Sequence, residues 1–397
     1  MRNNPLFRQD MRLVLDAGIL DWSLFLRNYA KAGQALRFYS KYNQKFSCFP
    51  YLWKKFHECE ENNSHFKKFR TILVVGRTED LAGIQCIVGW VQTFIGKHHQ
   101  SFPEIYFIAH PDPELFWEMI GTLDSECTGI VIICSNPNDL FPYIILLRYL
   151  EFLKSSKCCV TQHVMIWIPK GIDFPCIRSV VQTFSLNVHH YSMITPKSSF
   201  CFNEISLSIG NLIGFHFNLF LEGAKTTCQQ YFHHSLKSPL EGAALYTTLK
   251  QQYPTLSHWV WNTTQSFQPL AQWIQWIWKD VLPPQQNICF PKHISHSPFF
   301  SLGFTTTFWE KKNITDVFFP SYLKSSDTQY TKIHLKQLLE QEFKTTCKNL
   351  TENNHAVRIF YVKQLNEEIL GALIAHFLLE TTLLFLMEED NTFPSPI

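Results

Sequence analysis

The sequence predicts an α/β fold with two doubly wound domains, each a mostly parallel sheet flanked by helices. Short, continuous apolar runs such as 71–76 alternate with helical stretches, which is typical of buried parallel strands joined by crossover helices. The chain has 397 residues, 46% of them hydrophobic and 17% charged. That length and composition are sufficient for two cores of ordinary size.

The first half of the chain supplies the clearest elements. Its first 65 residues are expected to be mainly helical, with aromatic anchors and few helix breakers. Apolar runs then predict strands at 71–76, 105–109, 129–134, 163–169 and 188–191. Helices are expected between them at 81–95, 113–123 and 140–153.

The second half repeats this layout without a sequence repeat. Helices are expected at 207–230, 240–251, 268–280 and 369–387, and strands at 258–261, 288–290, 316–319 and 357–362. The boundary is soft, near 192–205. We therefore predict an N-terminal helical segment (1–65), a first α/β domain (66–200) and a second α/β domain with a C-terminal helix (201–397).

One stretch, 369–387, has nearly the length and apolarity of a membrane span. His376 and Glu380 near its middle would be costly in hydrocarbon, and a polar start precedes it, so we predict a buried amphipathic helix and no membrane partner. The balance of 35 Lys and Arg against 33 Asp and Glu, a net charge of +2, argues against a nucleic-acid partner.

The N-terminus has no apolar run behind its positive charges, so we expect no secretory signal and a cytoplasmic location with reduced thiols. The 12 Cys lack metal-ligand spacing. His293 and His296 could ligate a metal only from one helix face, and the prolines at 291 and 298 argue against a helix there. We expect no metal and no cofactor.

Two segments, 202–225 and 365–394, resemble the bacterial short form of glucose-6-phosphate isomerase. The resemblance covers roughly residues 50 to 394. It implies two sugar-isomerase (SIS) domains, so the doubly wound domains are expected to be SIS-type. It also implies the family reaction, the interconversion of glucose 6-phosphate and fructose 6-phosphate in glycolysis and gluconeogenesis.

In that family, small and hydroxyl residues after the first and third strands bind the substrate phosphate through backbone N–H groups and hydroxyls. The corresponding turns here are 76–83 and 134–142. Their candidate substrate-binding residues are Arg77, Thr78, Ser135 and Asn136.

The same turns also carry groups that oppose phosphate binding. Glu79 and Asp139 add carboxylates that would repel a phosphate dianion, and Pro137 removes a backbone donor. Arg77 could compensate in part. The alternative is a pair of ordinary strand-to-helix turns with Asn138 or Asp139 as the helix N-cap.

Aldose–ketose isomerisation needs a carboxylate base, a second acid/base and cations that stabilise the enediolate. The resemblance places Asp280 where the catalytic Glu stands, but Phe202 where an arginine stands and Phe300 where a histidine stands. Asp280 is a methylene shorter than Glu. His296, a few residues upstream of Phe300, is the candidate displaced histidine.

These replacements favour a family member that is no longer catalytic and acts as a binding or structural protein. Two alternatives stay open. One is an active isomerase with Asp280 as base and His296 as acid/base; the other is a binding protein for a less charged carbohydrate derivative. The expected partners are a sugar phosphate or related small molecule and a second copy of the chain.

Overall fold

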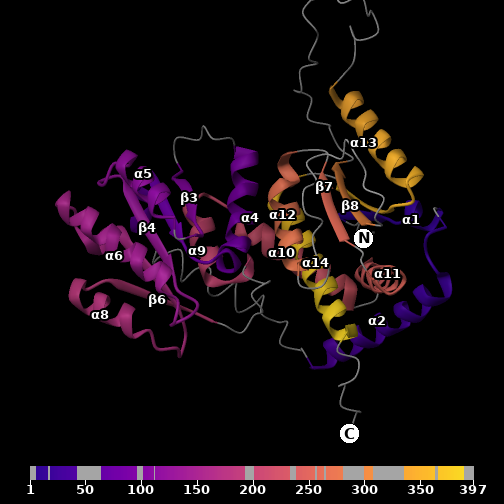
Figure 1. Cartoon of the computed structure of the whole chain (residues 1–397), viewed down its shortest axis with the longest axis horizontal. Helices are drawn as coiled ribbons and strands as arrows, with labels where there is room; N and C mark the ends of the chain where they lie inside the picture. The colour runs from indigo at the N-terminus through magenta and orange to yellow at the C-terminus, as the bar shows by residue number, and fades with distance from the viewer. Residues whose placement is uncertain are drawn as a thin grey trace, which may run out of the picture. The chain divides into compact units, whose positions relative to one another are not determined.

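The computed structural model describes residues 6–16, 18–42, 64–95, 102–110, 112–192, 201–232, 238–254, 257–262, 265–279, 299–306, 335–362 and 365–388. Their contacts divide the chain into two compact units (Figure 1). One unit is residues 43–225, and the other combines residues 1–42 with 226–397. The three-part domain division expected from the sequence stays a prediction.

The unit of residues 43–225 is built on a five-stranded sheet whose strands are all parallel. The strands are β2 (Thr71–Val75), β3 (Glu104–Ile108), β4 (Thr128–Ile133), β5 (Val164–Pro169) and β6 (Asn187–Tyr191). Their order is β3-β2-β4-β5-β6. The chain therefore reverses direction across the sheet between β2 and β4. The predicted parallel, doubly wound sheet is confirmed.

A short helix, η2 (Ser64–Lys68), precedes β2. The strands are connected by α4 (Thr78–Ile95), α5 (Pro113–Thr122), α6 (Leu140–Ser155), α7 (Val160–His163) and α8 (Pro175–Phe184). Every residue of β2 and β4 is buried, because helices cover both faces of a doubly wound sheet. Tyr149 of α6 is also buried, and its hydroxyl donates to the carbonyl of Thr128 at 2.9 Å. The core of this unit therefore lies between the sheet and its helices.

The single helix expected at 207–230 is two helices, α9 (Glu204–Leu212) and α10 (Phe217–Phe232). The break lies at Gly214, whose φ of 74° is in the left-handed region that favours glycine. A Cβ at this position would also overlap the ring of Phe102. Asn203 caps α9 by accepting a hydrogen bond from the backbone N–H of Ser206 at 2.8 Å.

The other unit has a four-stranded mixed sheet in the order β1-β9-β8-β7. Its strands are β1 (Phe7–Asp10), β7 (Ser257–Asn262), β8 (Phe299–Thr306) and β9 (Ala356–Val362). β7, β8 and β9 are parallel, while β1 pairs with β9 antiparallel. The sequence did not predict β1 or β8, and the strands expected at 288–290 and 316–319 lie outside the described residues.

The helices of this unit are α1 (Arg12–Asp16), α2 (Trp22–Tyr42), α11 (Ser238–Gln252), η4 (Gln265–Phe267), α12 (Gln268–Trp278), α13 (Leu335–Glu352) and α14 (Glu367–Glu388). An 18-residue window of α14 is apolar enough to cross a membrane, and 83% of it is buried in the structure. All residues from Ile369 to Thr381 are buried. The prediction of a buried helix is therefore confirmed, but the helix is not amphipathic, because it has no exposed face over this stretch.

Candidate functional site

The candidate site lies in the unit of residues 43–225, at the carboxyl ends of β2 and β4. Ligands in doubly wound sheets bind where the strand order reverses, and here that point falls between these two strands. β2 is followed by Gly76 and Arg77 before α4 begins, and β4 is followed by 134–139 before α6 begins. The two loops therefore share one edge of the sheet.

An ion pair connects the two loops. The Arg77 guanidinium donates to both carboxylate oxygens of Asp139, from Nε to Oδ2 and from Nη2 to Oδ1, the latter at 2.5 Å. The same carboxylate caps α6 by accepting the backbone N–H of Phe141 at 3.1 Å. The Arg77 guanidinium carbon also lies 5.4 Å from the centre of the Phe141 ring. We call the Arg77–Asp139 pair the loop clasp.

The electrostatics of the clasp favour both charged forms. Burial alone would raise the pKa of the Asp139 carboxyl, but hydrogen bonds from Arg77 and from the Phe141 backbone outweigh it and hold the pKa below its usual value. The hydrogen bond to Asp139 raises the pKa of Arg77. The Asp139 side chain is only 10% exposed and that of Arg77 is 41% exposed, so the pair is partly shielded from water.

A second contact connects the β4–α6 loop to the first turn of α4. The hydroxyl of Ser135 donates to the carboxylate of Asp80 at 2.7 Å, and Asp80 is fully buried at the start of α4. Within the β4–α6 loop, the side-chain oxygen of Asn136 accepts the backbone N–H of Asn138 at 3.0 Å. The Ser135 hydroxyl and the Asn136 amide oxygen are thus engaged inside the protein.

An open pocket of about 500 Å³ lies against the two loops. Its polar side comes from the loops and the start of α4, and its apolar side from the first turns of α6. The lining residues are Arg77, Glu79, Ser135, Asn136, Asn138, Asp139, Leu140, Phe141 and Ile144. Its volume is in the range of small-molecule sites.

The structure brings the four predicted substrate-binding residues to this edge of the sheet. Arg77, Ser135 and Asn136 line the pocket, and Thr78 is the first residue of α4 beside it. That they bind a substrate stays a prediction. The capping role considered for Asp139 is confirmed. The sequence analysis did not predict the loop clasp itself. A signal was present, because a cationic residue, Arg77, and a carboxylate, Asp139, lie in the loops after two neighbouring strands.

The catalytic candidates Asp280 and His296 lie outside the described residues. Phe202, which the sequence resemblance would place at the family's arginine position, is buried, and its ring centre lies 4.9 Å from that of Phe220. This aromatic side chain is therefore part of the packing of its unit. Within the described residues, no group of three or more His, Cys, Asp or Glu side chains is arranged to hold a metal ion.

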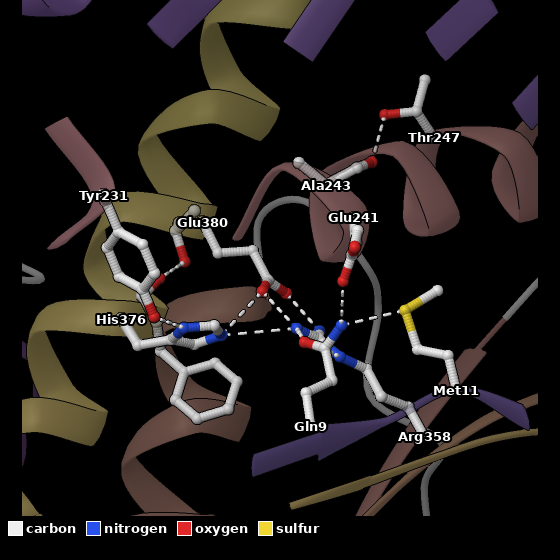
Figure 2. Close-up of polar contacts among 11 residues, drawn as sticks. Gln9, Met11, Tyr231, Glu241, Ala243, Thr247, Arg358, His376 and Glu380 are labelled. Carbon is white, nitrogen blue, oxygen red and sulfur yellow. Dashed lines mark hydrogen bonds and ion pairs between the residues drawn. The ribbon is translucent and has the colours of Figure 1, made fainter. Parts of the chain in front are cut away.

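A second polar cluster, in the other unit, was not predicted as a group (Figure 2). Arg358 of β9 donates from Nη1 and Nη2 to the two carboxylate oxygens of Glu380 on α14, at 2.6 and 2.7 Å. His376, one turn earlier on α14, lies 3.1 Å from the same carboxylate through Nε2 and 2.5 Å from the Tyr231 hydroxyl through Nδ1. Arg358 also donates to the side-chain oxygen of Gln9 on β1 at 3.0 Å.

Arg358, His376 and Glu380 are all fully buried. Burial lowers the pKa of His376 and so favours the neutral imidazole, whose Nε2 faces Glu380 and Arg358 and whose Nδ1 faces the Tyr231 hydroxyl. Burial opposes ionisation of Glu380, but its pKa is lowered because Arg358 and His376 contact it. The cluster joins β1, β9, α10 and α14, and its central residues are closed to solvent, so we expect it to stabilise the packing of the sheet against these helices.

The five-stranded parallel sheet with its flanking helices is similar to the fold of solved phosphosugar isomerase structures. A hypothetical protein from Thermus thermophilus matches with a TM-score of 0.77 and 15% sequence identity, over 96% of this chain and 94% of that chain. A candidate phosphosugar isomerase from Salmonella typhimurium matches with a TM-score of 0.51 and 10% identity, over 86% and 95% of the two chains.

A glucose-6-phosphate isomerase from Chlamydia trachomatis is also similar. It matches with a TM-score of 0.64 and 15% identity, over 84% of this chain and 68% of that chain. No protein-family model and no curated protein matches the sequence. At these identities the similarity shows the fold alone.

Proposed function

We propose that this chain is a glucose-6-phosphate isomerase-like SIS protein that does not isomerise sugar phosphates and acts as a binding protein. The observation that carries the proposal is the loop clasp. In the resembling family, the two loops bind the substrate phosphate. Here the guanidinium of Arg77, which is the cation these loops offer, already holds a carboxylate of the protein itself.

Asp139 competes with any phosphate at the same cation. Both of its oxygens accept from Arg77, and its tether to the α6 N-terminus gives it a high effective concentration there. A phosphate dianion would have to displace this carboxylate and would then lie beside it and Glu79. Repulsion between these two carboxylates and the phosphate opposes binding, so a sugar phosphate is a poor ligand for this pocket.

The test is a coupled assay for conversion of fructose 6-phosphate to glucose 6-phosphate, with the purified chain and an Asp280→Asn variant. We expect no turnover above that of the variant. Turnover that the variant abolishes would overturn the proposal and favour the alternative of an active isomerase with Asp280 as base.

A second experiment tests the clasp directly. Asp139→Ser removes the carboxylate but keeps a residue type that caps helices well. We expect this variant to bind inorganic phosphate in a titration followed by NMR, whereas the unmodified chain does not. Glu151→Ser, which removes an exposed carboxylate further along α6, is the matched control and should leave phosphate binding absent. Equal phosphate binding by all three proteins would contradict the proposal.

We also propose that the chain forms a homodimer and is located in the cytoplasm. The first proposal is supported by the family resemblance and the second by the sequence composition. Sedimentation of the purified chain at several concentrations tests the first, and cell fractionation tests the second. Sedimentation as a monomer at every concentration would exclude the homodimer.

A further inference from the structure

Two buried cysteine thiols lie against each other in the unit of residues 43–225. Cys86 is on α4, and Cys201 lies two residues before Asn203, the N-cap of α9. Both are free thiols, and they are 1% and 0% exposed. The Cys201 thiol donates to the carbonyl oxygen of Gly83 on α4, with 3.6 Å between sulfur and oxygen, and it also forms a side-chain hydrogen bond with Cys86. Gly83 and Cys86 are three residues apart and share one face of α4, so Cys201 packs on that face.

The contact between these thiols joins two segments that are far apart in the sequence. The strands β3, β4, β5 and β6 and the helices α5 to α8 all lie between Cys86 and Cys201. A covalent bond between the two sulfurs would therefore close a long loop that contains most of the five-stranded sheet. Closing such a loop restricts the unfolded chain, so we expect the crosslinked unit to unfold less readily than the reduced one.

We propose that Cys86 and Cys201 are a redox-sensitive pair, which a hydroperoxide oxidises to a disulfide and a dithiol reduces again. One thiolate attacks a peroxide oxygen, the O–O bond breaks, and a sulfenic acid and hydroxide form. The second thiolate attacks the sulfur of the sulfenic acid, the S–S bond forms, and a second hydroxide leaves. The two thiol protons neutralise the two hydroxides, so two thiols and one hydrogen peroxide give one disulfide and two water molecules. The pair takes no part in the proposed function, and the isomerase assay therefore does not bear on it.

Burial decides which oxidant reacts with the pair. It raises the pKa of the Cys201 thiol, and the hydrogen bond with Cys86 raises this pKa further, so the reactive thiolate is disfavoured and oxidation is slow. Hydrogen peroxide is small and uncharged, so a brief local opening of the unit admits it. Glutathione disulfide is larger and charged, and we expect it to modify the exposed thiols of Cys159 and Cys176 instead.

Crosslink mapping by mass spectrometry tests the proposal on the purified full chain after treatment with hydrogen peroxide. Free thiols are alkylated in denaturant, and the chain is then digested without reduction. We expect a peptide pair joined through Cys86 and Cys201 as the main crosslink, and its loss after treatment with dithiothreitol. Recovery of these two cysteines only as free thiols or as separate sulfinic and sulfonic acids would overturn the proposal. An equal yield of the crosslink from glutathione disulfide would overturn the selectivity that we derive from burial.

Two variants test whether the crosslink changes the stability of the unit. Cys86→Ala cannot form it, and Cys134→Ala, which removes another buried thiol of the same unit, is the matched control. After peroxide treatment, amides of α4 and α9 that exchange only on unfolding should exchange at least about tenfold more slowly in the unmodified chain and in Cys134→Ala, but not in Cys86→Ala. Dithiothreitol should abolish the difference. Unchanged exchange in the crosslinked chain would overturn the expected effect on stability, and the mapping experiment decides on the pair itself even if a variant fails to fold.

Discussion

Glu380→Gln is the most direct test of the buried cluster in the unit of residues 1–42 and 226–397. The substitution keeps the size of the side chain and removes its charge. Glu380 accepts from the Arg358 guanidinium at 2.6 and 2.7 Å, and both side chains are fully buried. Removing one partner of such a pair leaves a buried charge without compensation, which costs about 3–5 kcal/mol.

The loss of stability expected in Glu380→Gln is large enough to be distinguished from the effect of a surface substitution on the same helix. Glu388 on α14 pairs with Lys250, and both side chains are about two-fifths exposed (41% and 42%). An exposed pair of this kind contributes at most about 1 kcal/mol, so Glu388→Gln is the matched control. A double variant, Arg358→Met with Glu380→Leu, removes both charges and should lose less stability than Glu380→Gln alone.

Hydrogen exchange measured by mass spectrometry suits this chain, because peptides from the two compact units can be followed separately. Amides of α14 that exchange only when the unit unfolds should lose more than about 100-fold of their protection in Glu380→Gln. Peptides from β4, in the other unit, provide the internal reference and should be unchanged. If Glu380→Gln proves as mild as Glu388→Gln, the cluster does not stabilise the fold and our reasoning fails.

Three further outcomes are expected. Gly242→Ala should destabilise the same unit by about 1–3 kcal/mol in urea, because a Cβ there would overlap Glu380 and lie 2.5 Å from Arg358 Nη2; unchanged stability would contradict this contact. Burial lowers the pKa of His355 from 6.5 to about 4, so between these pH values the unfolded state binds more protons than the folded state. The free energy of unfolding should therefore fall as the pH is lowered from 6.5 to about 4, and it should fall less steeply in His355→Gln. Ser135→Ala removes the hydroxyl that donates to the buried Asp80 at 2.7 Å and should destabilise the unit of residues 43–225 by about 1–3 kcal/mol, visible as faster exchange in β4.

The parallel sheet could be predicted because its strands are buried on both faces. Such strands are continuous apolar runs, as in Thr71–Val75, and each is followed by a helix. β1 gives no such signal, since three of the four residues in Phe7–Asp10 are charged or polar. It is a strand because it pairs with β9, far away in the chain. The helix break at Gly214 had a local signal, because glycine is the usual residue where a helix ends in the left-handed region, but the nearby Phe102 ring is distant in the chain.

The location of the candidate site followed from topology, but its chemistry did not. Strand order puts the loops after β2 and β4 together, whereas the pairing of Arg77 with Asp139 depends on how the loops face each other. The buried cluster had a partial signal, because Arg358 lies in a mostly apolar strand, and His376 and Glu380 lie in the mostly apolar middle of α14. Only the structure shows that these polar residues satisfy one another.

The pairing of β1 with β9 has a consequence for the order of folding on the ribosome. Residues 43–225 form one uninterrupted unit, which can fold as soon as it has emerged. The unit that contains β1 is discontinuous, and its first strand cannot find its partner until the ribosome has synthesised the chain as far as Ala356–Val362. During that interval Phe7 lacks Phe360 of β9, whose ring centre lies 5.7 Å from its own, whereas α2 can already pack on α11. Protection from aggregation therefore reaches β1 later than it reaches α2.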